Sequence, residues 1–302
     1  MSAPGRRLKP PAPFAQVSRS SGMRTKACML RTLIAGAALS VTASAAAHAD
    51  ERPLWEVGFG AGVIAFNDYR GANATHVWPV PVPYFIFRGD ILKVDREGLR
   101  GKLFRQDRVE LNLSVDATPP VRNDSARAGM PDLRSTLEIG PELDVHLWRS
   151  ADRRVKLDLR TPVSAAITIA PDPQRAGTIY DAHLSLDIAQ FAGEYGWKLG
   201  LLAGPLWEDR RYDNYFYGVA PQYTTPTRPA YDAPGGYAGT QTLVSLSRRY
   251  PSFWVGAFLR HDSLGGASFE ASPLVQRNNY WFGGFGIVWI LRQSSRLVES
   301  EE

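Results

Sequence analysis

The sequence predicts an all-β protein, a transmembrane antiparallel β-barrel of about 12 strands, with 10 as the alternative number. Three observations carry this prediction: apolar and polar residues alternate with period two, the alternating segments are about 9 to 13 residues long, and aromatic residues gather near their ends. Tilted strands that cross a membrane need ~9–11 residues, and barrels carry aromatic girdles at both interfaces. Strands of soluble sheets average ~5–6 residues, so a secreted β-sandwich is the weaker alternative.

The chain begins with a segment that we predict to be removed. Met23 opens a positively charged region, an apolar run follows over residues 33–47, and Ala47-His48-Ala49 precedes Asp50. This order of features is that of a secretory signal peptide cleaved after Ala49. The apolar run is too short, and too rich in Ala and Ser, for a membrane-spanning helix.

Cleavage there divides the sequence into three parts. Residues 1–49 are a cytoplasmic leader extension plus the signal peptide, residues 50–291 the outer-membrane barrel, and residues 292–302 a polar C-terminal tail. The removed part holds seven basic residues and no acidic one, so the mature chain has 28 basic and 30 acidic residues and a net charge of −2. That charge predicts no nucleic-acid partner. Cys28, the single cysteine, lies in the removed part, which excludes disulfides and thiol catalysis from the mature chain.

Eleven segments of the mature chain carry the strand pattern. They lie at residues 55–65, 75–87, 91–103, 107–116, 135–148, 153–168, 181–192, 195–207, 237–250, 252–262 and 279–291. An odd number of strands does not leave both termini in the periplasm. Asp95-Arg96-Glu97-Gly98 can form a turn inside the third segment, and splitting the segment there gives twelve strands. Ten strands result if short segments pair outside the membrane.

The segment "DAHLSLDIAQFAG" at residues 181–193 shows which side of each strand meets water. Successive side chains of a strand point to opposite faces. We therefore expect Leu184, Leu186 and Ile188 to face lipid, and Asp181, His183 and Asp187 to face a polar lumen. The reverse arrangement would place charges in hydrocarbon, which costs ~2–4 kcal/mol for Arg or Lys at the midplane and less for Asp or Glu.

The lengths of the connections predict the topology. Short links at 149–153, 193–195 and 248–252 are typical of periplasmic turns. Long links at 118–134, 170–180, 208–236 and 263–278 are typical of outer loops.

Three stretches carry a family resemblance. They are "NDYRGANATHVWPVPVPYFIFRGD" (67–90), "YFYGVAPQYTTPTRPAYDAPGGY" (215–237) and "SPLVQRNNYWFGGFGIVWIL" (272–291). In this order they resemble the first loop with its Pro-punctuated second strand, the long loop, and the last loop with the closing strand of the MipA/OmpV family, the MltA-interacting outer-membrane proteins. The resemblance runs over nearly all of residues 54–291 in matching order.

The resemblance implies a barrel surrounded by outer-membrane lipid in a Gram-negative bacterium. It implies a scaffold role that brings a lytic transglycosylase near a peptidoglycan synthase in cell-wall assembly. Some relatives are described instead as porins for small solutes or as antibiotic-uptake proteins, which gives the alternative function. No catalytic residue and no cofactor come with the family. Family members usually end at an aromatic residue, whereas here Leu291 takes that place and "RQSSRLVESEE" follows.

The residues themselves predict no enzyme and no metal site. His261, Asp262 and Ser263 are neighbours on a strand and face alternate sides, so they do not form one catalytic triad. His146 and His183, with nearby carboxylates, lack the close spacing of metal ligands, and pairing with lumen cations is the favoured interpretation. The glycines of "VGFGAGV" at 57–63 precede no helix and are therefore strand glycines, not a phosphate loop.

Two sets of residues are candidates for partner binding. Arg153, Arg154, Arg248 and Arg249 lie in the most charged predicted periplasmic turns, where an acidic partner would form bidentate ion pairs. The alternative is that these arginines anchor the barrel at the inner leaflet. Asp68, Tyr69, Tyr231 and Asp232 belong to the family-matched loops, and they either contact a partner or stabilise the loops.

Overall fold

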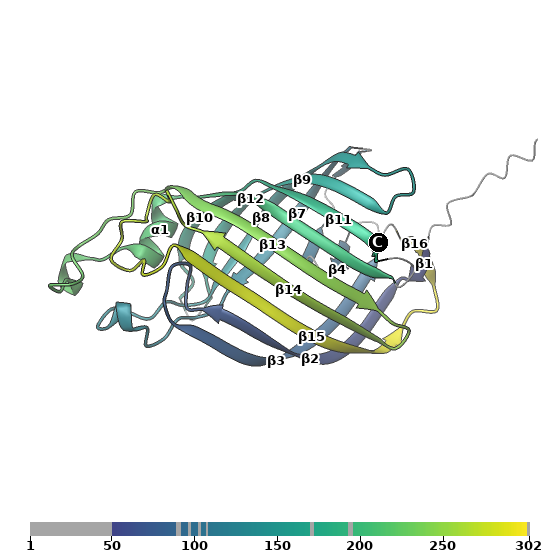
Figure 1. Ribbon diagram of the computed structural model, residues 1–302, viewed down its shortest axis with the longest axis horizontal. Coiled ribbons are helices and arrows are strands. Elements are labelled where there is room, and N and C mark those ends of the chain that lie inside the picture. Colours follow the sequence, from purple (N-terminus) through teal and green to yellow (C-terminus); the bar gives the residue numbers. More distant parts are fainter. Residues whose placement is uncertain are drawn as a thin grey trace, which may run out of the picture. The chain divides into compact units, whose positions relative to one another are not determined.

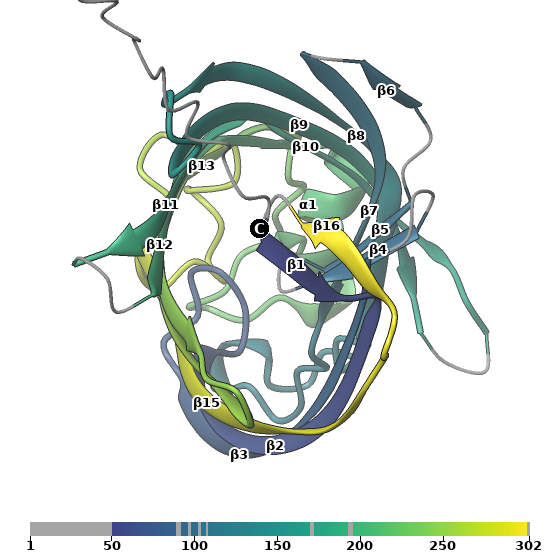
Figure 2. The ribbon, with the colours of Figure 1, turned by 90° about the vertical axis from the view of Figure 1, so that its right-hand side faces the viewer.

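The computed structural model describes residues 50–88, 92–95, 98–101, 104–106, 108–169, 172–192 and 196–300. All of them belong to the unit that spans Ala47–Glu302. The predicted signal peptide therefore lies outside the described residues. Strands surround the axis of this unit, as Figure 2 shows in a view along it, and Figure 1 shows the same strands from the side.

The described strands are mostly long and all pair antiparallel. Their bounds are β1 (Asp50–Pro53), β2 (Trp55–Asn67), β3 (Thr75–Arg88), β4 (Leu92–Asp95), β5 (Gly98–Gly101), β6 (Phe104–Gln106), β7 (Val109–Thr118), β8 (Thr136–Arg149), β9 (Val155–Thr168), β10 (Arg175–Asp181), β11 (His183–Phe191), β12 (Trp197–Glu208), β13 (Gly236–Arg249), β14 (Phe253–Ser263), β15 (Asn279–Gln293) and β16 (Leu297–Ser300). Three short helices lie in the connections that the structure describes: η1 (Ser125–Arg127), α1 (Arg210–Tyr217) and η2 (Pro221–Tyr223). Within the described part of the chain, no helix is long and apolar enough to cross a bilayer.

One sheet runs in the order β5-β4-β3-β2-β15-β14-β13-β12-β10-β9-β8-β7-β6, and β11 pairs with both β12 and β9. It closes because β5 and β6 both lie beside β7. Counting β10 and β11 as one interrupted strand, and β5 and β6 as another, gives twelve strands among the described residues. The transmembrane barrel predicted from the sequence is thus confirmed. Asp95 pairs with Gly98, as expected for a turn at that place, although Arg96 and Glu97 lie outside the described residues.

One predicted connection is wrong. Residues 170–180 were expected to form a long outer loop, but β10 begins at Arg175 and pairs with β9 and β12. The strand is interrupted rather than absent, because a bulge follows Arg175 and the ladder breaks again at Ala182 before β11. Bulges disturb the alternation from which strands are predicted, which explains the error.

The lipid and lumen faces follow the prediction for β11. Leu184 is 48% exposed, whereas the adjacent Ser185 is buried. Leu186 pairs with Leu201, and Asp187 pairs with Lys156 and Gly200 on the opposite face. Large exposed aromatics gather on the outer side of other strands, among them Trp148, Trp207, Trp281 and Trp289.

Inward-facing glycines allow the sheet to curve tightly. A Cβ on Gly60 would lie 2.0 Å from the carbonyl oxygen of Ile287, and one on Gly140 would lie 1.9 Å from that of Val163. No other residue fits where backbones approach so closely. These glycines are therefore required by the close approach of neighbouring backbones, and those at 57–63 lie in a strand, as the sequence predicted.

The main hydrophobic core lies in the long loops and not in the barrel wall. We call the loops at 68–74, 119–135, 209–235 and 264–278, with α1, the cap. Its core contains Leu264, Phe269 and Leu274, all fully buried, and the rings of Tyr217 and Phe269 stack at 3.8 Å. The cap occupies one end of the barrel, where Figure 1 shows α1.

The two ends of the described chain meet at the opposite end of the barrel. β1 pairs with β16, with Asp50 opposite Ser300 and Pro53 opposite Leu297. This two-stranded ribbon lies across the barrel end in Figure 2. β15 continues to Gln293, two residues past the predicted end of the barrel. Short turns lie at the same end as this ribbon, and short turns are typical of the periplasmic side of outer-membrane barrels.

Candidate functional site

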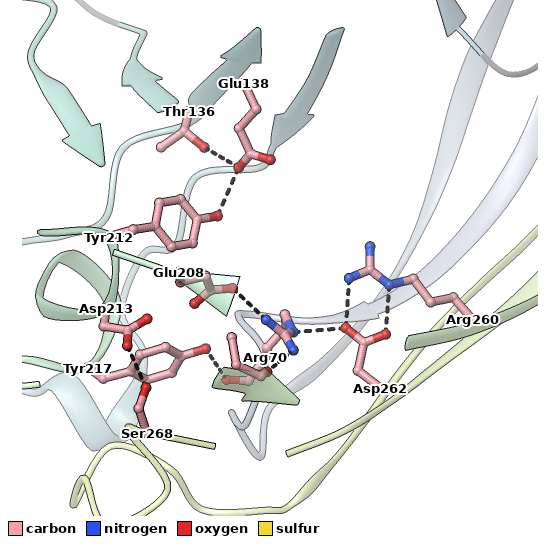
Figure 3. Close-up of polar contacts among 11 residues, drawn as sticks. Arg70, Thr136, Glu138, Glu208, Tyr212, Asp213, Tyr217, Arg260, Asp262 and Ser268 are labelled. Carbon is pink, nitrogen blue, oxygen red and sulfur yellow. Dashed lines mark hydrogen bonds and ion pairs between the residues drawn. The ribbon is translucent and has the colours of Figure 1, made fainter. Parts of the chain in front are cut away.

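A buried charged cluster lies where the cap meets the lumen, and Arg70 is at its centre (Figure 3). Arg70 comes from the loop after β2. Its Nη1 lies 2.6 Å from Glu208 Oε1, its Nε lies 2.8 Å from Asp262 Oδ2, and its Nη2 donates to the carbonyl of Ala238 at 2.5 Å. The cluster therefore joins the cap to β12, β13 and β14.

Asp262 bridges two arginines. Besides Arg70, it accepts both Nε and Nη2 of Arg260 at 2.8 and 2.7 Å, and its side chain is fully buried. Residues 260 and 262 alternate with His261 on β14, so the strand period places both on the lumen side. The planar guanidinium makes this bidentate geometry possible.

Helix α1 adds three side chains to the same region. Asp209 caps the helix by accepting the Tyr212 amide at 2.8 Å. Tyr212 then donates to Glu138 Oε1 at 2.8 Å, and Tyr217 donates to the carbonyl of Arg70 at 3.0 Å. Asp213 accepts the hydroxyl of Ser268 at 2.9 Å (Figure 3).

Glu208 and Asp213 form a carboxyl pair. Glu208 Oε2 and Asp213 Oδ1 are both buried and neither receives a donor, and the two side chains are within hydrogen-bond reach of each other. Two carboxylate oxygens repel unless a proton lies between them, so one shared proton satisfies both. Burial raises the pKa of Asp213 above its ordinary value, and the hydrogen bonds from its neighbours offset this only in part.

The other ionisable groups of the cap follow the same balance between burial and charge. Burial alone would lower the pKa of Arg70, but the carboxylates of Glu208 and Asp262 outweigh it and raise that pKa. Burial raises the pKa of Tyr212 and of Tyr217 well above the ordinary value. Arg70 is therefore always charged, and both tyrosines act as hydrogen-bond donors.

Three of the family-motif residues contact other parts of the cap, and Asp68 contacts β3. Asp68 lies 2.7 Å from His76 Nε2, and the Tyr69 hydroxyl donates to the carbonyl of Leu274 at 2.8 Å. Tyr231 donates to the carbonyl of Ser268 at 3.4 Å. Asp232 pairs with Arg210 and accepts Asn214 Nδ2 at 2.9 Å. These contacts support the loop-stabilising interpretation, and a partner role for the four residues stays a prediction.

The four predicted partner arginines do not form one patch. Arg153 and Arg154 are exposed in the turn between β8 and β9. Arg248 faces outward, with its guanidinium 4.5 Å from the Tyr250 ring and 5.8 Å from the Trp197 ring. Arg249 faces inward and binds Glu56 Oε2 at 3.0 Å. Strands β11 and β12 separate the two turns.

Among the described residues, His261, Asp262 and His146 do not come together as a catalytic site. His261 binds Asn279 and packs on Trp281 on the outer face, while Asp262 faces the lumen. His146 pairs with Asp158 at 2.9 Å. Among the described residues, no group of three or more His, Cys, Asp or Glu side chains is arranged to hold a metal ion.

The sequence analysis missed the cap, and it placed Arg70 in a family-matched loop without predicting the buried charged cluster around it. A signal was present for α1, since Asp209 is a good N-cap and Tyr212 and Phe216 share one helical face. No local pattern marks Arg70, because its partners are more than 130 residues away in the chain.

The fold and the site define a class of protein, an outer-membrane β-barrel with a polar lumen and a folded outer cap. A family model described as MltA-interacting protein MipA matches residues 59–291. The chain therefore belongs to the MipA family and is an outer-membrane protein of Gram-negative bacteria. A search of curated protein sequences finds no match.

Several solved structures resemble the chain weakly. A bacterial polysaccharide outer membrane secretin is 10% identical, with a TM-score of 0.39 and coverage of 78% of this chain and 99% of that one. Outer membrane phospholipase A from Escherichia coli is 13% identical, with a TM-score of 0.31 and coverage of 79% and 94%. The P. putida toluene transporter TodX is 10% identical, with a TM-score of 0.26 and coverage of 80% and 68%. At these values no function is transferred from the three proteins.

Proposed function

We propose that the protein is a non-catalytic outer-membrane scaffold that brings a lytic transglycosylase and a peptidoglycan synthase together in cell-wall assembly. The observation that carries the proposal is the folded cap, whose apolar core and charged cluster cover the outer end of the barrel. Cell-wall enzymes act from the periplasm, so their contact surface is the opposite end. The description of the family as MltA-interacting supports the same partner class.

Two arginines at the periplasmic end, Arg153 and Arg154, are suited to bind an acidic partner. Both side chains are exposed, and Arg154 Nε lies 3.6 Å from Oδ2 of Asp152, which is also exposed. Their guanidinium groups remain able to form bidentate pairs with a partner carboxylate. Arg248 lies among aromatic rings at the level expected for the membrane interface, which favours an anchoring role for this residue.

A capture experiment tests the scaffold. The Arg153→Gln, Arg154→Gln, Arg248→Gln variant keeps Arg249, because the fully buried Glu56 would lose its ion pair with this residue. We expect this variant to fold as the wild type and to bind an immobilised lytic transglycosylase about tenfold or more weakly, as two or three lost charge-assisted bonds predict. Arg122→Gln in an exposed outer loop is the matched control.

One outcome of this experiment would contradict the scaffold role, and another would contradict the proposed contact surface. If wild-type protein in detergent captures neither a lytic transglycosylase nor a peptidoglycan synthase, the scaffold role is wrong. If capture occurs and the triple variant binds as well as the Arg122→Gln control, the contact lies elsewhere, and the β1–β16 ribbon becomes the next surface to vary.

A narrow channel for small solutes is the second candidate, because charged side chains of both signs line the lumen. Glu142, Asp144 and Arg160 form one such group, with Arg160 Nη2 2.5 Å from Glu142 Oε1. Planar-bilayer conductance separates the two functions. Stable ion current through wild-type protein would favour the channel, and its absence together with partner capture would favour the scaffold.

A further inference from the structure

An open groove of about 300 Å³ lies on the lipid-facing wall of the barrel, across β11, β12 and β13. We call it the apolar groove. Strand pairing builds it from two rows of side chains, Leu184, Ala203 and Thr242 in the row nearer the cap and Leu186, Leu201 and Val244 in the next row. Residues that lie opposite each other on antiparallel strands share a face, and Leu184 and Val244 are exposed, so both rows face outward. The groove is hollow because the small side chains of Ala203 and Thr242 lie among larger ones.

The apolar groove lies in the outer half of the membrane. Trp207, near the outer end of β12, and Leu201, in the groove, are six residues apart on one continuous strand. At ~3.3 Å per residue and a tilt of about 45°, this separation corresponds to a depth of roughly 14 Å. Half of a hydrocarbon core that is ~30 Å thick is about 15 Å. The groove is therefore at the level of the acyl chains of the outer leaflet.

An aromatic cluster lies between the apolar groove and the outer end of the strands. Trp207 is paired with Tyr180 of β10 and with Tyr237 of β13, and its ring centroid lies 5.4 and 6.4 Å from theirs. Tyr180 and Trp207 are both exposed on the outer face. Aromatic side chains of membrane proteins gather at the level of the lipid headgroups. The cluster lies above the groove, because Trp207 and Ala203 are on the same face of β12.

Two exposed arginines lie at the outer end of β10, beyond the aromatic cluster. Arg175 begins β10 and is paired with the outward Ile167 of β9, and its Nη2 donates to Thr178 Oγ1 at 2.7 Å. Arg211 is the second residue of α1, and this helix begins beside Thr178 because the Asp209 amide donates to the Thr178 carbonyl at 2.9 Å. Figure 1 shows α1 at this end of β10.

The guanidinium groups of Arg175 and Arg211 are available to an anion. Among the residues that the structure places, neither forms an ion pair. The nearby carboxylates have other donors, since Asp209 caps α1 and Asp172 accepts Gln174 Nε2 at 3.1 Å. Arginine binds phosphate oxygens through charge-assisted hydrogen bonds, so this end of β10 is suited to a phosphate group.

We propose that this face of the barrel holds one phosphate-bearing lipid of the outer leaflet. Its phosphate lies against Arg175 and Arg211, its headgroup junction against the aromatic cluster, and one acyl chain in the apolar groove. The three features follow one another from the outer surface toward the membrane midplane in the order of the parts of a lipid. Acyl chains gain van der Waals contact in a groove that a flat wall does not offer.

This lipid site goes beyond the scaffold proposal and does not depend on it. The site lies on the outer half of the lipid-facing wall, and the proposed partner surface lies at the periplasmic end. Lipid retention and partner capture are therefore separate measurements, and failure of one leaves the other standing.

Native mass spectrometry of the protein folded in detergent measures the binding of lipid A, a glucosamine disaccharide that carries phosphates and acyl chains. Dephosphorylated lipid A keeps the chains without the charge, and inorganic phosphate, added as a competitor, keeps the charge without the chains. The headgroup variant is Arg175→Gln with Arg211→Gln, and its control is Arg122→Gln with Arg277→Gln in other exposed outer loops. The groove variant is Ala203→Phe, and its control is Ala257→Phe, which is also exposed and outward but lies on β14 outside the groove.

We expect the headgroup variant to bind lipid A about tenfold or more weakly than its control, and wild-type protein to bind dephosphorylated lipid A more weakly by a similar factor. The groove variant should bind lipid A about threefold or more weakly than Ala257→Phe, because the phenyl ring fills the space for the chain. An equal concentration of inorganic phosphate should not displace lipid A. Heat-modifiable gel migration confirms that each variant is folded.

Three results would overturn the proposal. Equal binding of lipid A by the folded headgroup variant and its control would show that the arginines do not hold the phosphate. Equal binding by Ala203→Phe and Ala257→Phe, or displacement of lipid A by inorganic phosphate, would show that no chain lies in the groove. A wild-type dimer that Ala203→Phe converts to a monomer would show that a second copy of the chain covers the groove instead.

Discussion

Replacing Arg70 by methionine tests whether the charged cluster holds the cap on the barrel. The side chain of Arg70 is 13% exposed, and those of Glu208 and Asp262 are 3% and 0% exposed. Removing one partner of a buried ion pair leaves an uncompensated charge and costs about 3–5 kcal/mol. Glu208 and Asp262 would both lose their bond to Arg70, so we expect a loss within that range.

Arg210→Met is the matched control in the same cap. Arg210 pairs with Asp232, but their side chains are 66% and 63% exposed. An exposed ion pair contributes little to stability because water screens it. The comparison therefore separates the effect of a buried arginine from the general effect of losing an arginine in the cap.

Hydrogen exchange of the α1 amides measures the result. A loss of about 3 kcal/mol raises the open population of the cap by roughly a hundredfold, and exchange rates rise with it. The barrel should keep its heat-modifiable migration, because the strand ladder does not depend on Arg70. If α1 exchanges at the same rate in Arg70→Met and Arg210→Met, the cluster does not hold the cap.

Three further predictions concern strand orientation, pH and processing. Leu186→Arg should impair assembly far more than Asp187→Asn, because it places a charge in lipid at a cost of ~2–4 kcal/mol near the midplane. Equal migration of the two variants on heat-modifiable gels would contradict the assigned faces. Because burial raises the pKa of Asp213 in the folded state, its contribution to the stability of the cap should be fully present below the ordinary value of 3.8 and be lost as pH rises through the raised pKa. Proteolysis of the loops measures this loss, and Asp213→Asn should make it smaller than in the wild type. The intact mass of envelope protein should correspond to a chain that begins at Asp50, and a mass that includes Cys28 would contradict cleavage after Ala49.

The barrel was predictable because each strand carries its own signal. A strand between lipid and lumen must alternate, and the alternation marks both its existence and its faces. The predicted segment at 135–148 corresponds to β8 (Thr136–Arg149), and that at 279–291 to β15 (Asn279–Gln293). Even the inward glycines at 57–63 follow from the strand assignment.

The alternation of inward and outward side chains could also have predicted the orientation of Arg249. Gln241, Ser245 and Ser247 share the inward face of β13, and position 249 has the same parity. The sequence analysis placed Arg249 where the predicted strand at 237–250 overlaps the predicted turn at 248–252, and it proposed partner binding for this residue. The structure keeps the alternation to the last residue of β13, where Arg249 binds Glu56.

The cap was not predictable, because its contacts join loops that are far apart in the chain and follow no period. Tyr69 binds the carbonyl of Leu274, 205 residues away, and Arg127 binds that of Phe216, 89 residues away. The apolar residues of these loops are spaced irregularly, so they indicate neither helix nor strand. Only α1 had a local signal.

The positions of the cluster residues imply an order of assembly. Arg70 follows β2, Glu208 ends β12, and Asp262 lies on β14, so the three meet only when β2, β15, β14, β13 and β12 are paired in one sheet. Before that pairing, Arg70 would lose its hydration with no carboxylate in place, which is unfavourable in a low-dielectric region. The cap core that packs above Arg70 depends on the same alignment, because Tyr217 donates to the Arg70 carbonyl. Barrel formation is therefore a precondition for a folded cap. The contacts of Arg70 with β12, β13 and β14 then fix the position of the cap on the barrel.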